Sequence, residues 1–144
     1  MLKLMYITNS PEIASIAQSA GADRIFIDME YIGKEERQKS MDTVKNHHTV
    51  SDVKAVRKVL DRSQLLVRVN PIHENSEQEI NTVINAGADI VMLPMWKSAG
   101  EVKKFADIVG DRAKKMLLLE TKEAWQCLDA VSYTHLRAHE TTLH

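Results

Sequence analysis

The sequence has a single cysteine, no long apolar run and no excess of either charge, and each of these absences excludes a class of protein. One cysteine, Cys127, cannot form an intramolecular disulfide. The first residues, MLKLMYITNS, hold too short an apolar stretch for a signal peptide, and no run approaches the length of a membrane span. The formal net charge of -1 provides no electrostatic basis for binding nucleic acid or an anionic membrane. The composition therefore predicts a cytoplasmic protein that acts on a small molecule.

The last residues of the chain, VSYTHLRAHETTLH at 131–144, have neither a helical nor a strand period. His135 and His139 stand four apart, as zinc ligands on a helix often do, but no third or fourth ligand accompanies them. The first eleven of these residues resemble the in-frame translation of a sequencing-library adapter of the transposase type. We therefore expect residues 131–144 to be a non-native tail that, from Val131 on, packs against nothing and holds no metal. Residues 1–130 are expected to be the amino-terminal part of one domain.

Apolar segments alternate with helical patterns along the rest of the chain. Strands are predicted at residues 2–7, 24–29, 64–70, 89–94 and 115–120, and helices at residues 10–21, 49–60, 76–87, 98–110 and 121–130. Ser10 with Pro11 predicts one helix start, and Thr49 with Asp52 predicts a capping box at the next. The strands are almost entirely apolar, which is typical of strands covered on both faces. This alternation predicts an α/β fold with a parallel sheet.

A weak internal repeat supports this organisation, because AGADRIFIDM at 20–29 returns as AGADIVMLPM at 86–95. In each copy the glycine is expected to end a helix and the aspartate to lead into the next strand. Two parallel architectures remain open, the doubly wound sheet and the eight-stranded barrel. No glycine-rich phosphate-binding motif follows a strand, so the doubly wound sheet lacks its usual signature.

Polar side chains occur at the carboxyl ends of three predicted strands. The alternation of strand side chains places Asp28 and Glu30 on one face of the second strand, and Arg68 and Asn70 on one face of the third. Glu120 ends the fifth strand. Parallel α/β folds carry their active sites at this end, although a single acidic residue there is more often only solvated. Carboxylates around a guanidinium suit a divalent metal and an anionic substrate.

Four segments together resemble the HpcH/HpaI aldolase and citrate lyase beta-subunit family of the phosphoenolpyruvate/pyruvate barrel superfamily. They are IFIDMEYIGKEERQ, LLVRVNP, GADIVMLPMWKSAGEVKKF and LLLETKEA. The resemblance implies a (β/α)8 TIM barrel, of which this chain holds about strands one to five. It also implies Mg²⁺ or Mn²⁺ and a carbon–carbon lyase or aldolase that acts through a metal-stabilised enolate of pyruvate, a related oxo-acid or an acyl thioester. By position, Glu120 matches the family's metal-binding glutamate, and Arg68 matches the arginine that holds the substrate's oxygens.

These arguments give a set of candidate site residues. Arg68, Asp28 and Glu30 are predicted to be catalytic, Arg68, Asn70 and Trp96 to bind substrate, and Glu120 to bind the metal. Arg68 and Glu120 are expected to point into the same pocket, with Asp28 and Glu30 nearby. For Trp96, which follows the fourth strand, capping the core is an equally good interpretation.

The sequence departs from the family pattern in two ways. Tyr31 stands where pyruvate aldolases of the family carry a histidine base, and His47 or His48 could supply an imidazole instead. The second metal carboxylate of the family falls beyond the native part of the chain, so we expect this chain alone to be inactive. Unpaired edges at the first and fifth strands also lead us to expect poor solubility. The alternatives are a phosphate-binding metabolic barrel and a non-catalytic keto-acid-binding barrel. We expect the parent protein to be a homo-oligomer.

Overall fold

A computed structural model describes residues 1–33 and 48–132 of the chain. The strands are β1 (Met5–Ile7), β2 (Arg24–Asp28), β3 (Gln64–Arg68), β4 (Ile90–Leu93) and β5 (Lys114–Leu117). The helices are α1 (Pro11–Ser19), α3 (Val50–Val59), α4 (Ser76–Ala86), α5 (Ala99–Val109), α6 (Lys122–Gln126) and α7 (Leu128–Val131). The predicted alternation of strands and helices is thus confirmed.

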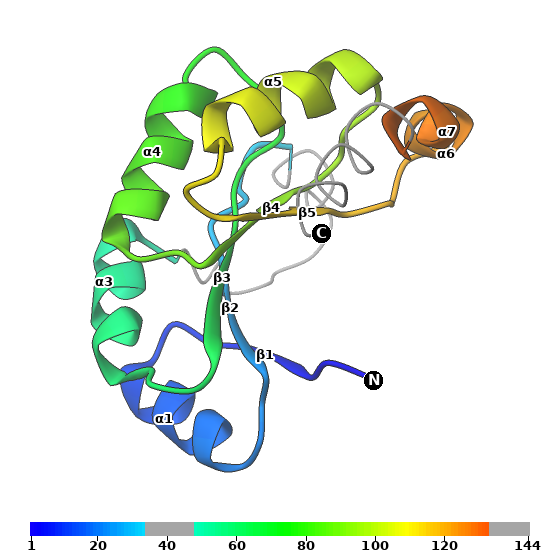
Figure 1. Cartoon of the computed structure of the whole chain (residues 1–144). Helices are drawn as coiled ribbons and strands as arrows, with labels where there is room; N and C mark the ends of the chain where they lie inside the picture. Colours follow the sequence, from blue (N-terminus) through cyan, green and yellow to red (C-terminus); the bar gives the residue numbers. More distant parts are fainter. Residues whose placement is uncertain (34–47, 133–144) are drawn as a thin grey trace, which may run out of the picture.

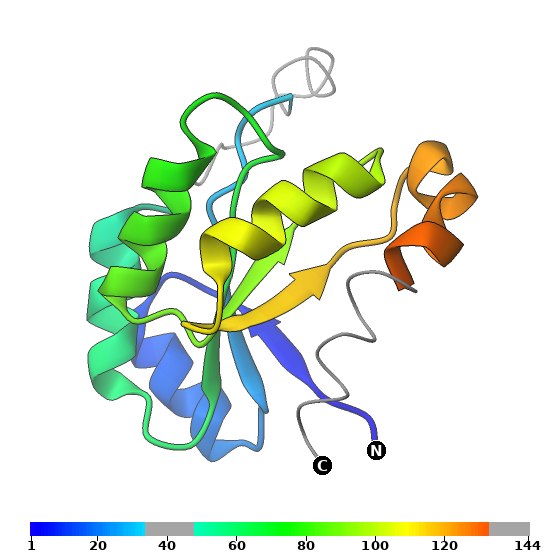
Figure 2. The ribbon, with the colours of Figure 1, turned by 45° about the horizontal axis from the view of Figure 1, so that its top comes forward.

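The five strands form one parallel sheet in the order β1-β2-β3-β4-β5. A doubly wound sheet reverses its strand order at a switch point and carries helices on both faces. Here the order never reverses, and α1, α3, α4 and α5 form an arc along one side of the curved sheet (Figure 1). The view in Figure 2 shows the same helices on the outer side of the fanned strands. The chain therefore has the α/β fold of a partial TIM barrel, and the doubly wound alternative is excluded.

The helices begin at the residues whose side chains can cap them. The Ser10 hydroxyl accepts a backbone N–H of the first turn of α1, as predicted. At α3 both hydrogen bonds of the capping box between Thr49 and Asp52 are present. The same reciprocal pair, Ser98 with Glu101, starts α5, although this box was not among the sequence predictions.

The aspartate of each AGAD repeat holds the start of a neighbouring strand. Asp23, before β2, accepts the backbone N–H of Leu4 at 2.9 Å. Asp89, before β4, accepts that of Leu65 in β3 at 2.8 Å. The glycine that precedes each aspartate has positive φ, 102° and 118°, as expected for a residue that ends a helix. The repeat therefore fixes the helix end and the strand register together.

The main core lies between the sheet and its helices, where residues of β2, β3 and β4 pack against the apolar faces of α1, α3, α4 and α5. The opposite face of the sheet carries a smaller apolar cluster. It consists of Phe26, Leu66, Ile90 and Met92, with Met116 and Leu118 packed against it. At the edge strand the expectation of cover on both faces is wrong. The side chains of Met5, Tyr6 and Ile7 in β1 are exposed because no further strand lies beside them in the described chain.

The strands end earlier than the sequence pattern predicts. β2 ends at Asp28 and β3 at Arg68, so Glu30 and Asn70 lie beyond the strands in which alternation was assumed. β5 ends at Leu117, three residues before Glu120. Side-chain direction after these points is set by loop contacts and not by the pleat.

The carboxyl-terminal helices continue the packed fold up to Val131. This residue ends α7, is fully buried and belongs to the main core. The expectation that the chain packs against nothing from Val131 onward is therefore wrong at Val131, because α7 contributes an apolar side chain to the layer beneath α5. His135 and His139 lie outside the described residues. None of the described helices is long and apolar enough to cross a membrane.

Candidate active site

Asp28 and Arg68 form a bidentate ion pair at the carboxyl ends of β2 and β3. The two residues are direct partners in the parallel register of the sheet. Arg68 Nε donates to Asp28 Oδ1 at 2.9 Å, and Nη2 donates to Oδ2 at 2.7 Å. Their side chains are 18% and 17% exposed, so water screens the pair only in part. This fork-to-fork geometry fixes the plane of the guanidinium.

Two further residues fix the same guanidinium. Glu30 places Oε2 3.3 Å from Arg68 Nε, and its carboxylate is almost fully buried. The backbone N–H of Glu30 also donates to Asp28 Oδ1 at 3.1 Å, which ties the segment after β2 to the pair. Below them, the Phe26 ring lies 5.3 Å from the guanidinium carbon of Arg68, within cation–π distance. Arg68 is therefore held by two carboxylates and an aromatic face.

The surroundings of Arg68 keep it charged. The hydrogen bond that Arg68 donates to Asp28 is the largest cause that raises the pKa of Arg68. Partial burial opposes the rise, and the charges of Asp28, Glu30 and Glu120 add to it. A carboxylate can act in this way only from nearby. Glu120, on the connection after β5, therefore lies within electrostatic reach of Arg68.

Glu120 stands on the connection between β5 and α6 and contacts the connection after β4. Its Oε1 accepts the backbone N–H of Met95 at 3.0 Å. Met95 has φ of 49°, a left-handed conformation that is uncommon for a residue other than glycine. Strained backbone of this kind is often held in place at functional sites. The Glu120 side chain is otherwise exposed, so it remains available to a ligand.

The described residues do not by themselves complete a magnesium or manganese site. Such ions need several hard oxygen ligands, usually including more than one carboxylate. Glu120 is one, but Asp28 and Glu30 are both engaged by Arg68. Within residues 1–33 and 48–132, no group of three or more histidine, cysteine, aspartate or glutamate side chains is placed to hold a metal. The predicted metal ion thus stays a prediction.

Asn70 lies inside the loop network and not in the open part of the site. It is 1% exposed, and its Oδ1 accepts the backbone N–H groups of Tyr31 and Ile32 at 2.8 and 2.9 Å. Its Nδ2 donates to Glu79 Oε2 of α4 at 2.6 Å. These bonds occupy the amide that was predicted to bind substrate. Asn70 instead ties the segment after β2 to helix α4, because β3 has ended and its side chain no longer follows the strand's alternation.

Trp96 belongs to the core and not to an exposed pocket. Its side chain is 2% exposed and lies in the main cluster between sheet and helices. Its backbone carbonyl accepts the hydroxyl of Thr121 at 2.7 Å, which links the connections after β4 and β5. Of the two interpretations weighed for Trp96, its position fits the core cap, because the indole is buried in the cluster between the sheet and the helices.

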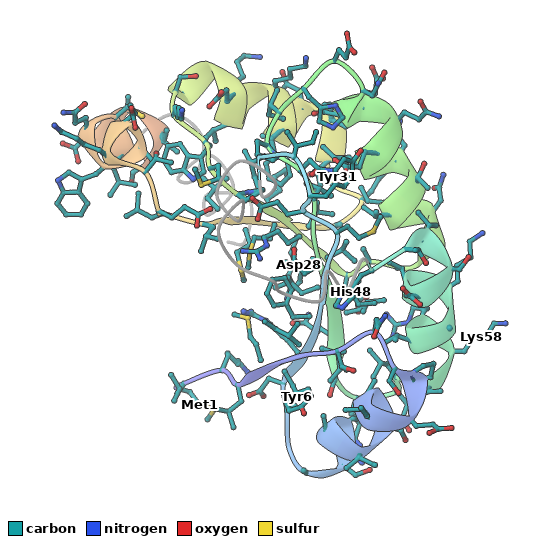
Figure 3. The ribbon with its side chains drawn as sticks, turned by 180° about the vertical axis from the view of Figure 1, so that it is seen from behind. Met1, Tyr6, Asp28, Tyr31, His48 and Lys58 are labelled. Carbon is teal, nitrogen blue, oxygen red and sulfur yellow. The ribbon has the colours of Figure 1, made fainter. Side chains whose placement is uncertain are left out.

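His48, just before α3, contacts Asp28 of the Asp28–Arg68 ion pair. Its Nδ1 accepts the backbone N–H of Asp28 at 2.9 Å, and Figure 3 shows the two residues side by side. A backbone N–H can only donate, so Nδ1 must be unprotonated, and the neutral ring carries its proton on Nε2. Tyr31, which the sequence resemblance aligns with a histidine, is 56% exposed on the segment after β2. No local signal in the sequence predicts the contact between His48 and Asp28, and His47 lies outside the described residues.

Two solved structures share the fold of this chain. The HpcH/HpaI aldolase from Desulfitobacterium hafniense DCB-2 is similar with a TM-score of 0.66 at 15% identity, over 92% of this chain and 59% of its own. A variant of the citrate synthase SbnG is similar with a TM-score of 0.61 at 13% identity, over 90% and 52%. The chain thus spans little more than half the length of either structure. A comparison with curated proteins gives no match.

At these identities the two structures establish the shared fold alone. The family follows from the sequence itself, because a family model described as HpcH/HpaI aldolase/citrate lyase matches residues 3–135. That range includes all five strands and the residues Asp28, Arg68 and Glu120 at their carboxyl ends. The chain belongs to the HpcH/HpaI aldolase/citrate lyase family, a family of aldolases and lyases.

Proposed function

We propose that the parent protein is a carbon–carbon lyase or aldolase that works through the enolate of pyruvate, a related oxo-acid or an acyl thioester. In this proposal Arg68 holds the oxygens of the substrate. One observation carries the assignment: the Arg68 guanidinium is fixed by Asp28 and Glu30 while part of it is left unused. Family membership supports the reaction class.

The unused part of Arg68 is its second terminal nitrogen. Nε and Nη2 donate to Asp28, and Glu30 lies against Nε, whereas Nη1 donates to no acceptor among the described residues. A guanidinium offers five N–H groups in one plane. Nη1 can therefore donate to an incoming carboxylate or carbonyl oxygen without breaking the bonds that orient the group. Because Arg68 stays charged, it offers a permanent positive charge at this position.

Such a charge suits enolate chemistry. When a carbon–carbon bond next to a carbonyl breaks, its electron pair moves toward the carbonyl and negative charge develops on that oxygen. A fixed donor aimed at this oxygen stabilises the transition state more than the ground state. Asp28 and Glu30 then act as positioning residues, because both are already bound to the guanidinium. The proposal thus changes their predicted role from direct catalysis to orientation.

The remaining predicted site residues take different parts in the proposal. Asn70 positions the loop after β2, and Trp96 packs beneath the connection after β4. Glu120 is the carboxylate that remains for Mg²⁺ or Mn²⁺ in the parent protein, where further ligands must complete the site. The neutral form of His48, with its proton on Nε2, can donate a hydrogen bond but cannot accept a proton at Nδ1 without losing Asp28. A cytoplasmic homo-oligomer also remains a proposal.

The test uses the parent protein and pyruvate in heavy water. Enolate formation exchanges the methyl protons of pyruvate for deuterium, which proton NMR follows directly. We expect exchange by the parent protein and a loss of about 100-fold in Arg68→Lys, because lysine keeps the charge but loses the planar fork. Arg112→Lys is the matched control, since Arg112 contacts Asn81 and Ile108 away from the site. Equal exchange in Arg68→Lys and the parent would contradict the assignment.

The non-catalytic keto-acid-binding alternative has a distinct outcome in the same experiment. Tyr31, which is exposed where the family's histidine base is expected, is the observation that favours it. A binder would show saturable pyruvate binding that requires Arg68 but no exchange of methyl protons. A phosphate-binding metabolic barrel is disfavoured by the family match.

A further inference from the structure

A polar cavity lies at the amino-terminal ends of the strands, the end opposite to Arg68. Its volume is about 480 Å³. Its lining comes from the segment before β1, from the starts of β2, β3 and β5, and from the turns that precede β2 and β3. The side chains that matter for its chemistry are Lys3, Asp23, Arg24, Arg62, Gln64 and Lys114.

The cavity has an excess of positive charge. Four of its lining residues are cationic, Lys3, Arg24, Arg62 and Lys114, against a single carboxylate, Asp23. That carboxylate is already engaged, because Oδ2 accepts the backbone N–H of Leu4 and Oδ1 lies 3.9 Å from Lys3 Nζ. The chain as a whole has a net charge of -1, so this concentration of positive charge is local. Cavities with one sign of charge attract ligands of the other sign.

Arg24 lacks the acceptors that the other inward-facing arginine has. Its Nε is closed off from solvent and has no hydrogen-bond partner among the described residues. By contrast, Arg68, on the neighbouring strand β3 at the carboxyl end of the sheet, donates two hydrogen bonds to Asp28 and lies against Glu30. A buried donor without an acceptor costs about 1–3 kcal/mol, and such a group calls for an explanation. An anion in the cavity would meet the terminal nitrogens of Arg24 and offset part of this cost through its charge, because Nε itself is closed off from solvent.

The fold holds the other cations in place around Arg24. Gln18 Oε1 accepts the backbone N–H groups of Asp61, Arg62 and Ser63 at 2.8–3.0 Å, which fixes the turn that carries Arg62. Lys114 belongs to β5, at the opposite edge of the sheet from β1, and the curvature of the sheet brings it to the same cavity as Lys3. The cations therefore converge through tertiary structure and not through closeness in sequence.

We propose that this cavity is a binding site for a compact multivalent oxyanion, with the Arg24 guanidinium as its central ligand. Planar guanidinium groups bind phosphate and carboxylate oxygens in the same forked geometry, so a polyphosphate and a tricarboxylate share the chemistry that the site recognises. The volume is in the range of small-ligand sites. The inference is independent of the proposed enzymatic function, because it uses none of the residues around Arg68.

The test is titration of the full chain with inorganic tripolyphosphate in one arm and citrate in the other, at constant ionic strength. Calorimetry gives the affinity, and amide chemical shifts locate the site. We expect one saturable site for at least one of the two anions, with shifts at residues 22–24 and 62–64 and none at residues 68–70. Arg24→Gln should weaken binding at least tenfold. Lys103→Gln removes one charge from an exposed pair with Asp107 and should leave the affinity unchanged.

Lys114→Gln provides a second variant that does not depend on the half-buried Arg24. It should weaken binding several-fold, less than Arg24→Gln, because the Lys114 side chain is exposed. Absence of saturable binding to both anions would overturn the proposal. So would equal weakening by Arg24→Gln and Lys103→Gln, since that pattern reflects net charge alone. A third outcome would also overturn it: the chain binds neither anion but self-associates, and Arg24→Gln abolishes the self-association. The ligand of Arg24 would then be the carboxylates of a second protein chain. Shifts confined to the surroundings of Arg68 would assign the anion to the candidate active site.

Discussion

Asp28 holds Arg68 by two hydrogen bonds while its own backbone N–H is held by His48, so one residue connects β2, β3 and the start of α3. The backbone N–H of Asp28 points toward the β1 side of β2. No acceptor in β1 reaches it, because β1 ends at Ile7, opposite Phe26. The imidazole takes the place of the missing strand. The orientation of Arg68 thus depends on a contact between residues 20 positions apart.

Removing the charge of Asp28 should destabilise the fold more than removing an exposed carboxylate. Asp28→Asn leaves the largely buried Arg68 with Glu30 as its one remaining ion-pair partner among the described residues, so we expect a loss of about 2–4 kcal/mol in the free energy of unfolding. Asp107→Asn breaks an exposed pair with Lys103 and should cost about 0.5 kcal/mol or less. Urea unfolding of both variants measures the difference, and similar midpoints would show that the pair is not energetically special.

The Asp28–Arg68 pair should not make the free energy of unfolding depend on pH near neutrality. Asp28 raises the pKa of Arg68, so the stabilisation is complete below the pKa of arginine in the unfolded chain. It is lost only as pH rises through the still higher pKa of the folded state, far above neutral. The contribution of Arg68 to stability is the difference in the free energy of unfolding between the unsubstituted chain and Arg68→Met. We therefore expect this difference to stay constant from about pH 6 to pH 9. A contribution that falls across this range would contradict the assignment.

Asn70 and Glu79 should show strong coupling in a double-mutant cycle. Asn70→Asp removes the amide donor and places a second carboxylate against Glu79 Oε2, which should cost about 2–3 kcal/mol. Adding Glu79→Gln restores one donor and one acceptor, so the double variant should recover part of this loss. Chemical denaturation of the four proteins gives the coupling energy. Strict additivity would mean that the two side chains do not interact in solution.

Three glycine-to-alanine changes should separate backbone strain from steric clash. Gly100 lies in α5 with only ordinary contacts around its position, so Gly100→Ala should be neutral or slightly stabilising. Gly21 has φ of 102° and open space, so Gly21→Ala should cost about 1 kcal/mol from strain alone. At Gly87, with φ of 118°, a methyl group would also lie 2.5 Å from Arg57 Cδ. Gly87→Ala should be the most destabilising, and thermal unfolding ranks the three.

His48 should be replaceable by a residue that keeps an acceptor at the same place. The amide oxygen of His48→Asn can accept the backbone N–H of Asp28, whereas His48→Leu leaves that N–H without its acceptor. We expect His48→Leu to be less stable than His48→Asn by about 1 kcal/mol and to show faster amide exchange at Asp28. Nitrogen-15 NMR of the unsubstituted chain should find the neutral His48 ring protonated on Nε2. A proton on Nδ1 would contradict the hydrogen bond.

The sequence by itself determined the alternation of strands and helices, the caps at Ser10 and Thr49, and the role of the two AGAD turns. These features depend on interactions among residues close in the chain, which local pattern records. It also placed Asp28 and Arg68 on one face, because both lie inside strands whose side chains alternate. The order of the strands was beyond local pattern, since either parallel architecture uses the same strand and helix periods.

Tertiary structure alone decided the places of the residues beyond the strand ends. Asn70 turned to Glu79 and the segment after β2, and Trp96 entered the core, because side-chain direction outside a strand follows the nearest packing and hydrogen-bond partners. His48 met Asp28 only because the chain returns to the carboxyl end of β2 just before α3 begins. Contacts of this kind are set by burial and by unsatisfied backbone groups, which exist only once the sheet and helices have assembled.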